Sequence, residues 1–79
     1  MAESWKYDRE LDVSGLKCPL PVLKARKVLL AMTPGERLRV VATDPLSAVD
    51  MPHFAAESGN ALVATANADG RLIFLIERR

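Results

Sequence analysis

The run Gly15-Leu16-Lys17-Cys18-Pro19-Leu20-Pro21 constrains the fold of this 79-residue chain more than any other stretch. Apolar and polar residues alternate before it, and apolar residues recur at helical spacing after it, so it joins a strand to a helix. Because proline lacks an N–H group and has a fixed φ, it suits only the first turn of a helix. We therefore predict a helix that begins at Pro19, with Cys18 as the N-cap and Gly15 in the preceding tight turn.

This placement predicts the chemistry of Cys18, the only cysteine in the chain. The positive end of a helix dipole favours an anion, and Lys17 beside the thiol favours it too. We expect a thiol that is exposed at the helix start and has a lowered pKa. The alternative that these residues leave open is a small N-cap or half-buried filler, since free cysteines are often buried.

The periodicity of the remaining chain predicts four strands and two helices. The strands are expected over 7–13, 38–43, 61–66 and 71–78, and the weaker half of the first strand, 7–10, is expected to fray. The first helix should run over 19–32. The second should follow a short turn after Pro45 and end at about Ser58 before Gly59, with Pro52 in its opening turn. Asp44 is its expected N-cap, and Ser47 with Asp50 could form a second cap. Its expected apolar positions are Val49, Met51, Phe54 and Ala55.

The order strand, helix, strand, helix, strand, strand predicts an α+β fold. A helical crossover calls for parallel first and second strands, and the turn over 67–70 predicts a final antiparallel hairpin. The expected architecture is a two-layer α/β sandwich in which both helices cover one face of a mixed four-stranded sheet. Ile73 and Leu75 then fall on the opposite face, where we expect their neighbours to shield them. Residues 1–79 are expected to form one domain, with a loose N-terminus over 1–6.

Composition limits the chemistry that is available. Net charge is +1, so bulk electrostatics do not suggest nucleic-acid binding. One cysteine excludes an internal disulfide and dithiol redox cycling, and one cysteine with one histidine is too few for a zinc site. We expect His53 to be a surface residue, and we expect no substrate cleft. The first residues contain no apolar run typical of a signal peptide and no stretch could cross a membrane, so the expected location is the cytoplasm.

The motif Cys18-Pro19-Leu20-Pro21 resembles the Cys-Pro-x-Pro signature of the TusA/SirA family of small sulfur-carrier proteins. The resemblance extends from about Leu11 to the C-terminus. Its further landmarks are Leu11-Asp12 before Gly15-Leu16, the basic stretch over 22–27, Gly35-Glu36 and Thr43-Asp44-Pro45. Some relatives carry a second cysteine after the phenylalanine of the second helix, whereas Ala55 follows Phe54 here. That departure leaves Cys18 as the single thiol.

The resemblance implies the same two-layer fold and a persulfide sulfur carrier. Cys18 would accept sulfur from a cysteine desulfurase or another persulfide donor. It would then pass the sulfur to an acceptor protein in tRNA thiolation, cofactor sulfuration or sulfur oxidation. By position, Gly15, Pro19, Pro21, Asp44 and Pro45 would support the site. Such a protein is a sulfurtransferase-type carrier rather than an enzyme with its own substrate pocket. It needs no cofactor beyond the covalent persulfide.

Two questions stay open at this point. Lys17, Lys24, Arg26 and Lys27 surround the cysteine-bearing helix, either as a solvated face or as a docking patch for an acidic partner. Direct contact of this cluster with tRNA has less support. The alternative function is a non-catalytic regulatory or redox-sensing module of the same fold, in which the thiol is incidental or acts as the sensor.

Overall fold

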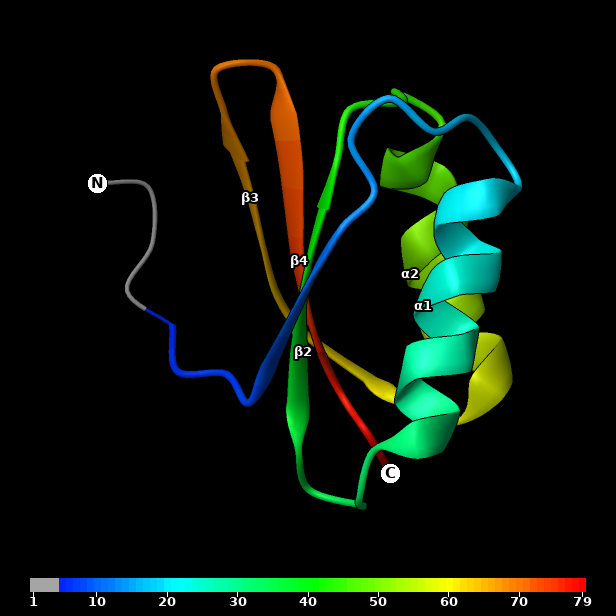
Figure 1. The fold of residues 1–79 in the computed structure, drawn as a ribbon, viewed down its shortest axis with the longest axis vertical. Helices are drawn as coiled ribbons and strands as arrows, with labels where there is room; N and C mark the ends of the chain where they lie inside the picture. The colour runs from blue at the N-terminus through cyan, green and yellow to red at the C-terminus, as the bar shows by residue number, and fades with distance from the viewer. Residues whose placement is uncertain (1–4) are drawn as a thin grey trace.

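Both helices cover one face of a four-stranded sheet (Figure 1). The computed structural model describes residues 5–79. The elements are β1 (Arg9–Asp12), α1 (Leu20–Ala31), β2 (Arg37–Ala42), α2 (Ser47–Ser58), β3 (Ala61–Ala68) and β4 (Arg71–Glu77). The expectation of a loose N-terminus falls largely on residues 1–4, which lie outside the described residues.

The strands follow the order β1-β2-β4-β3 across the sheet. β1 and β2 are parallel, with Leu11 opposite Val40, as a helical crossover requires. β4 is antiparallel to both β2 and β3. Asp69 and Gly70 close the β3–β4 hairpin with φ values of 52° and 79°. The predicted α+β, two-layer sandwich with a mixed four-stranded sheet is confirmed.

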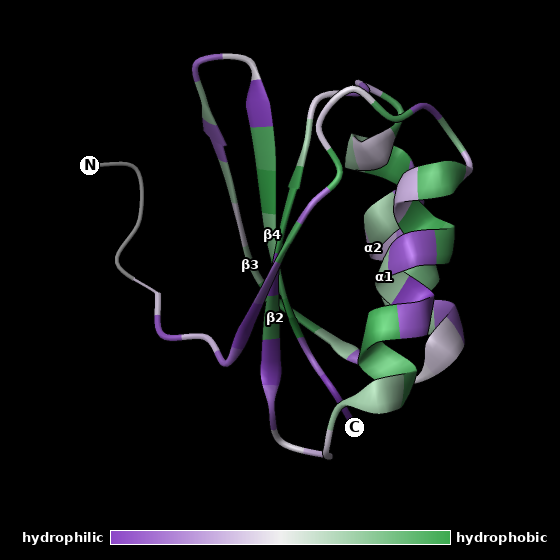
Figure 2. Ribbon diagram, in the orientation of Figure 1, coloured by the Kyte–Doolittle hydropathy of each residue, from purple (hydrophilic) through white to green (hydrophobic). Residues whose placement is uncertain are grey.

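The core lies between the sheet and the two helices, where the apolar sides of all these elements meet (Figure 2). On α1 the expected face is buried at Ala25, Leu29 and Met32. Its residues Val22 and Val28 pack partly buried against the same core. From the sheet, Leu38, Val40 and Ile76 are wholly buried. The helical and strand periodicities of the sequence thus converge on one core.

Two predictions for α2 are wrong. Val49 is 69% exposed, because the helix buries the face that carries Ser47, Met51, Phe54 and Ala55 instead. Pro52 lies inside the helix rather than in its opening turn. A proline at this point removes one backbone hydrogen bond of the helix, the one that would reach the carbonyl four residues earlier. The burial of Met51 and Phe54 on either side of Pro52 holds the helix together despite that loss.

The sheet face opposite the helices is shielded at its centre. Ile73 and Leu75 are 4% and 1% exposed, as expected of side chains covered by their neighbours. Val41 and Ala66 flank Ile73 on the adjacent strands, at positions that share its face of the sheet. This face therefore presents no open apolar centre.

Candidate active site

Cys18 lies one residue before the N-cap of the helix that it was predicted to cap. α1 begins at Leu20, and Pro19 is its N-cap, after a cis Cys18–Pro19 peptide bond. A turn closed by the Leu20 amide, which donates to the Lys17 carbonyl at 2.8 Å, precedes the helix and sets this start. The prediction of Cys18 as N-cap is wrong. Its thiol is free and exposed, and Pro21 is buried at the second position of the helix.

Two hydrogen bonds fasten the cysteine-bearing loop to the loop between β2 and α2. The Gly15 amide donates to Thr43 Oγ1 at 2.8 Å, and the Cys18 amide donates to Asp44 Oδ2 at 2.7 Å. Gly15 makes its turn with a φ of +83°, a conformation that a glycine adopts without steric cost. The side chains of Thr43 and Asp44 thus hold the segment that precedes α1.

Asp44 does not occupy the N-cap position that the sequence predicted. The N-cap of α2 is Leu46, whose amide donates to Asp44 Oδ1 at 3.2 Å. Asp44 therefore joins two chain segments, because its other carboxylate oxygen accepts from Cys18. The Cys18 amide holds the pKa of Asp44 below its usual range, with smaller contributions from the Leu46 amide and the charge of Lys17. Pro45 is exposed, and its carbonyl accepts a hydrogen bond from the Ala48 amide at 3.1 Å.

An open groove of about 200 Å³ runs from the thiol along α2, although the sequence predicted no cleft. Its lining residues are Cys18, Pro19 and Val22 from the start of α1, and Asp50, His53, Phe54 and Glu57 from α2. The groove exists because the loop that carries Cys18 reaches over to α2, so that one helix face forms its floor.

The pKa of the Cys18 thiol is raised, contrary to the prediction. The main cause is a hydrogen bond between the thiol and the Asp50 carboxylate, followed by partial desolvation and by the negative charges of Asp50 and Asp44. A thiolate at this point would face two carboxylates, and like charges disfavour its formation. The predicted effect of the helix dipole and Lys17 on the thiol pKa is opposed by Asp50 and Asp44, which are far from Cys18 in sequence and near it in the fold.

Asp50, His53 and Glu57 were missed as site residues. The spacing of three and four residues along one helix face is the signal that could have grouped them. The His53 side chain is 76% exposed, as expected of a surface residue, and its Nε2 lies 3.8 Å from Glu57 Oε2. Among residues 5–79 no hydrogen bond joins His53 to Cys18, whereas the cysteine–histidine pairs of cysteine hydrolases are hydrogen-bonded.

The four basic residues of the predicted cluster are exposed on the outer side of α1 and its preceding loop. Arg26 differs from Lys24 and Lys27 in lying against α2. Its guanidinium lies 5.2 Å from the centre of the Phe54 ring and 3.9 Å from Glu57 Oε1. Arg26 therefore belongs to the contact between the helices, whereas Lys24 and Lys27 project from the exposed side of α1.

In the part of the chain that the structure describes, no group of three or more His, Cys, Asp or Glu side chains could hold a metal ion. None of the helices formed by residues 5–79 has the length and apolar character needed to cross a membrane.

Comparisons with known proteins identify the relatives of this chain. The family described as "Sulfurtransferase TusA" matches residues 9–78. The sulfur carrier protein TusA of Allochromatium vinosum is 49% identical over 72 residues, which are 91% of this chain and 95% of the relative. The sulfur carrier protein TusA of Pseudomonas syringae is 35% identical over 77 residues, 98% of this chain and 92% of the relative. A crystal structure of a SirA-like protein from Desulfitobacterium hafniense superposes with a TM-score of 0.80. At 24% identity, over 89% of this chain and 96% of that one, it establishes the fold.

Proposed function

The chain belongs to the TusA family, and we propose that it is a sulfur carrier that binds its sulfur covalently at Cys18. The observation that carries this proposal is the position of the thiol. Cys18 is a free, exposed cysteine, held through its backbone by Asp44 at the end of an open groove. Because the thiol is exposed, a sulfur donor can reach it first and a sulfur acceptor can reach it afterwards. The relatives named as sulfur carriers support the same role.

The transfer is an exchange of one sulfur–sulfur bond for another. Cys18 Sγ attacks the terminal sulfur of a persulfide on the donor, and a bond forms between these two sulfur atoms. The bond between the terminal sulfur and the donor cysteine breaks, and the donor cysteine leaves as a thiolate that takes up a proton. The Cys18 proton is released in the same exchange, so neither an oxidant nor a reductant is required. In the second step an acceptor thiolate attacks the terminal sulfur now held on Cys18. The bond between that sulfur and Cys18 Sγ breaks, and Cys18 leaves as a thiolate that takes up a proton.

Asp50 is the proposed acceptor of the Cys18 proton. Hydrogen bonding and negative charge from its carboxylate raise the pKa of the Cys18 thiol, which favours the protonated thiol in the free protein. A protonated thiol is a poor nucleophile, which protects the carrier between partners. A donor surface that brings positive charge close to Asp44 and Asp50 would cancel this effect and favour the thiolate on docking.

The proposed donor is a cysteine desulfurase or another persulfide-bearing protein, and the proposed acceptor is a protein of tRNA thiolation, cofactor sulfuration or sulfur oxidation. Lys24 and Lys27 would guide these partners, because charges at the edge of an interface mainly accelerate association and orient it. Replacing both lysines with glutamate should slow sulfur transfer at low salt and reduce its dependence on salt. Equal transfer rates at low salt for this variant and the unmodified protein would show that the patch takes no part.

Intact-mass spectrometry without reductant tests the carrier role. The protein is incubated with a cysteine desulfurase and cysteine, and we expect a gain of one or more sulfur atoms that a thiol reductant removes. Cys18→Ser should show no gain. If the unmodified protein gains no sulfur from several persulfide donors, the regulatory or redox-sensing module becomes the better reading. In that case Cys18→Ser would leave binding to the regulated partner intact unless the thiol is the sensor.

A further inference from the structure

The groove beside Cys18 carries negative charge at the point where a sulfur donor must approach. The thiol and the partly buried Asp50 line this groove together. A second carboxylate, that of Asp44, is held beside the thiol by the 2.7 Å hydrogen bond that it accepts from the Cys18 amide. The charges that act most strongly on the thiol are those of these two carboxylates. A sulfur atom that approaches Cys18 therefore meets negative charge on both sides.

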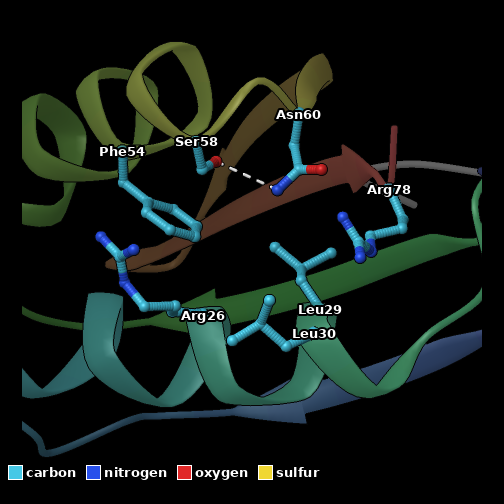
Figure 3. Close-up of a pocket in the computed structure, with 7 residues that line it drawn as sticks. All are labelled: Arg26, Leu29, Leu30, Phe54, Ser58, Asn60 and Arg78. Carbon is cyan, nitrogen blue, oxygen red and sulfur yellow. Dashed lines mark hydrogen bonds between the residues drawn. The ribbon is translucent and has the colours of Figure 1, made fainter.

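Glu57, the other acid that lines the groove, has basic side chains beside it. Arg26 extends from α1 toward Phe54 of α2 (Figure 3), with its guanidinium 5.2 Å from the ring centre and 3.9 Å from Glu57 Oε1. His53 Nε2 lies 3.8 Å from Glu57 Oε2. Arg26 does not line the groove itself. Its positive charge therefore offsets Glu57 rather than the carboxylates at the thiol.

Asp50 differs from the other two acids in its surroundings. The positive charge of Lys17 acts on Asp44 and contributes to the lowered pKa of that carboxyl. Among residues 5–79, no lysine, arginine or histidine side chain forms an ion pair with Asp50. A nearby counter-charge weakens the field of a carboxylate, and Asp50 lacks one within the described residues. Its negative charge is therefore the one that an approaching donor meets most directly.

Sulfur donors differ in the charge that surrounds the sulfur atom to be attacked. Inorganic polysulfide and thiosulfate carry this sulfur on an anion, whereas a protein donor can surround it with lysine and arginine side chains. Given the sulfur-carrier role proposed above, on which this inference rests, we propose that Asp50 is a specificity-determining residue. It slows reaction with anionic sulfur donors and favours donors that bring positive charge into the groove, because like charges repel during an encounter and opposite charges attract.

The same charge pattern describes the surface of a protein donor. Lys24 and Lys27, on the exposed side of α1, would meet acidic side chains of the donor. Asp50 would meet a lysine or arginine side chain beside the sulfur that is transferred. Val22 and Phe54 line the groove next to Asp50 and offer an apolar surface for the aliphatic stem of that side chain. A donor with this arrangement of charges fits the carrier in one orientation.

Exchange of the full chain with two small disulfides of opposite charge tests this role of Asp50. The reagents are cystamine, which carries two ammonium groups, and the disulfide of mercaptopropionate, which carries two carboxylates. The Cys18 thiolate attacks one sulfur atom of the reagent, a mixed disulfide forms, and the other half of the reagent leaves as a thiolate, so no oxidant or reductant is needed. Intact-mass spectrometry gives both rate constants at one pH and low salt. Because the same thiolate reacts with both reagents, a change in the Cys18 pKa cancels from their ratio.

The ratio of the cystamine rate to the mercaptopropionate disulfide rate is compared with that of a neutral thiol, N-acetylcysteine amide. We expect the ratio for the protein to be higher by at least about fivefold. Asp50→Asn should lower the ratio by at least about threefold, and high salt should lower it in the unmodified protein. Asp69→Asn is the matched control, because it removes an exposed acid from the β3–β4 hairpin, and it should leave the ratio unchanged. If Asp50→Asn does not fold, Asp50→Ser serves in its place with the same expected fall.

Three results would overturn the proposed role of Asp50. They are a ratio for the protein no higher than that of the neutral thiol, an unchanged ratio in Asp50→Asn, and an equal fall in the Asp50 and Asp69 variants. Disulfide exchange needs no persulfide, so its outcome is separate from the test of sulfur gain described above. Sulfur gain with an unchanged ratio would refute the selection by charge alone. A shifted ratio without sulfur gain would refute the carrier role and leave the effect of Asp50 on the thiol in place.

Discussion

Replacing Gly15 with alanine separates backbone strain from side-chain crowding in the loop that carries Cys18. Gly15 has a φ of +83°, and a Cβ placed on it would meet no atom within 4 Å outside its immediate neighbours. The cost of the substitution therefore lies in the backbone. A left-handed conformation costs an L-residue about 1–2 kcal/mol, and the reduced freedom of the unfolded chain returns about 0.4–1 kcal/mol. The net expected loss of unfolding free energy is about 1 kcal/mol.

Thermal and urea unfolding followed by circular dichroism measure this loss. A destabilisation of about 1 kcal/mol lowers the Tm of a domain of this size by about 4–8 °C. Gly15→Asn is the matched control, because asparagine tolerates the left-handed region better than alanine although its side chain is larger. We expect Gly15→Asn to lose less stability than Gly15→Ala. A loss in the asparagine variant that equals or exceeds that of the alanine variant would refute the reasoning and point to crowding.

Three further substitutions address the site and the core. Asp50→Asn removes the main cause of the raised Cys18 pKa. The pH midpoint for alkylation of Cys18 by iodoacetamide should therefore fall. An unchanged midpoint would contradict a hydrogen bond between the thiol and the Asp50 carboxylate. In the folded protein the pKa of Asp44 is lower than its ordinary value of 3.8. The ionised Asp44 therefore contributes its full stabilisation above pH 3.8, and this stabilisation is lost as the pH falls through the pKa of the folded state. Asp44→Asn should therefore flatten the acid limb of stability measured by urea unfolding at several pH values, and a limb as steep as before would exclude this contribution. Leu29 is 2% exposed, so Leu29→Ala should lower the free energy of unfolding by about 2–5 kcal/mol. Leu30 is 68% exposed, so Leu30→Ala should change it by no more than about 0.5 kcal/mol. Similar losses in the two variants would show that the buried face of α1 is misassigned.

Local pattern was sufficient to predict the order and approximate limits of the elements. The helical spacing of Ala25 and Leu29 and the alternation around Val40 each record the face that meets the core. Predictions were wrong where the local sequence allows more than one arrangement and tertiary packing determines which one forms. The sequence offers Val49 as an apolar position of α2, yet the helix rotates Ser47 inward and leaves Val49 exposed, because neighbouring Met51 and Phe54 fix which face is buried.

The candidate site divides in the same way. Two prolines beside the cysteine and a glycine before it were enough to predict an exposed thiol at the start of a helix, because proline and glycine act through their own backbone conformations. The ionisation of the thiol could not be predicted from its sequence neighbours. It depends on Asp50 and on Asp44, which is 26 residues away in sequence and hydrogen-bonded to the Cys18 amide.

The sequence by itself determined the position of the thiol in the turn between the first strand and the first helix. Residues 15–21 form this turn because glycine and proline fix the backbone conformation locally. What only the tertiary structure decided is the environment of that thiol and the groove beside it. Electrostatic effects and cavities depend on distances between residues that are far apart in the chain. Packing of α1 and its preceding loop against α2 brings Cys18 and Asp50 into one groove, although they lie far apart in the sequence.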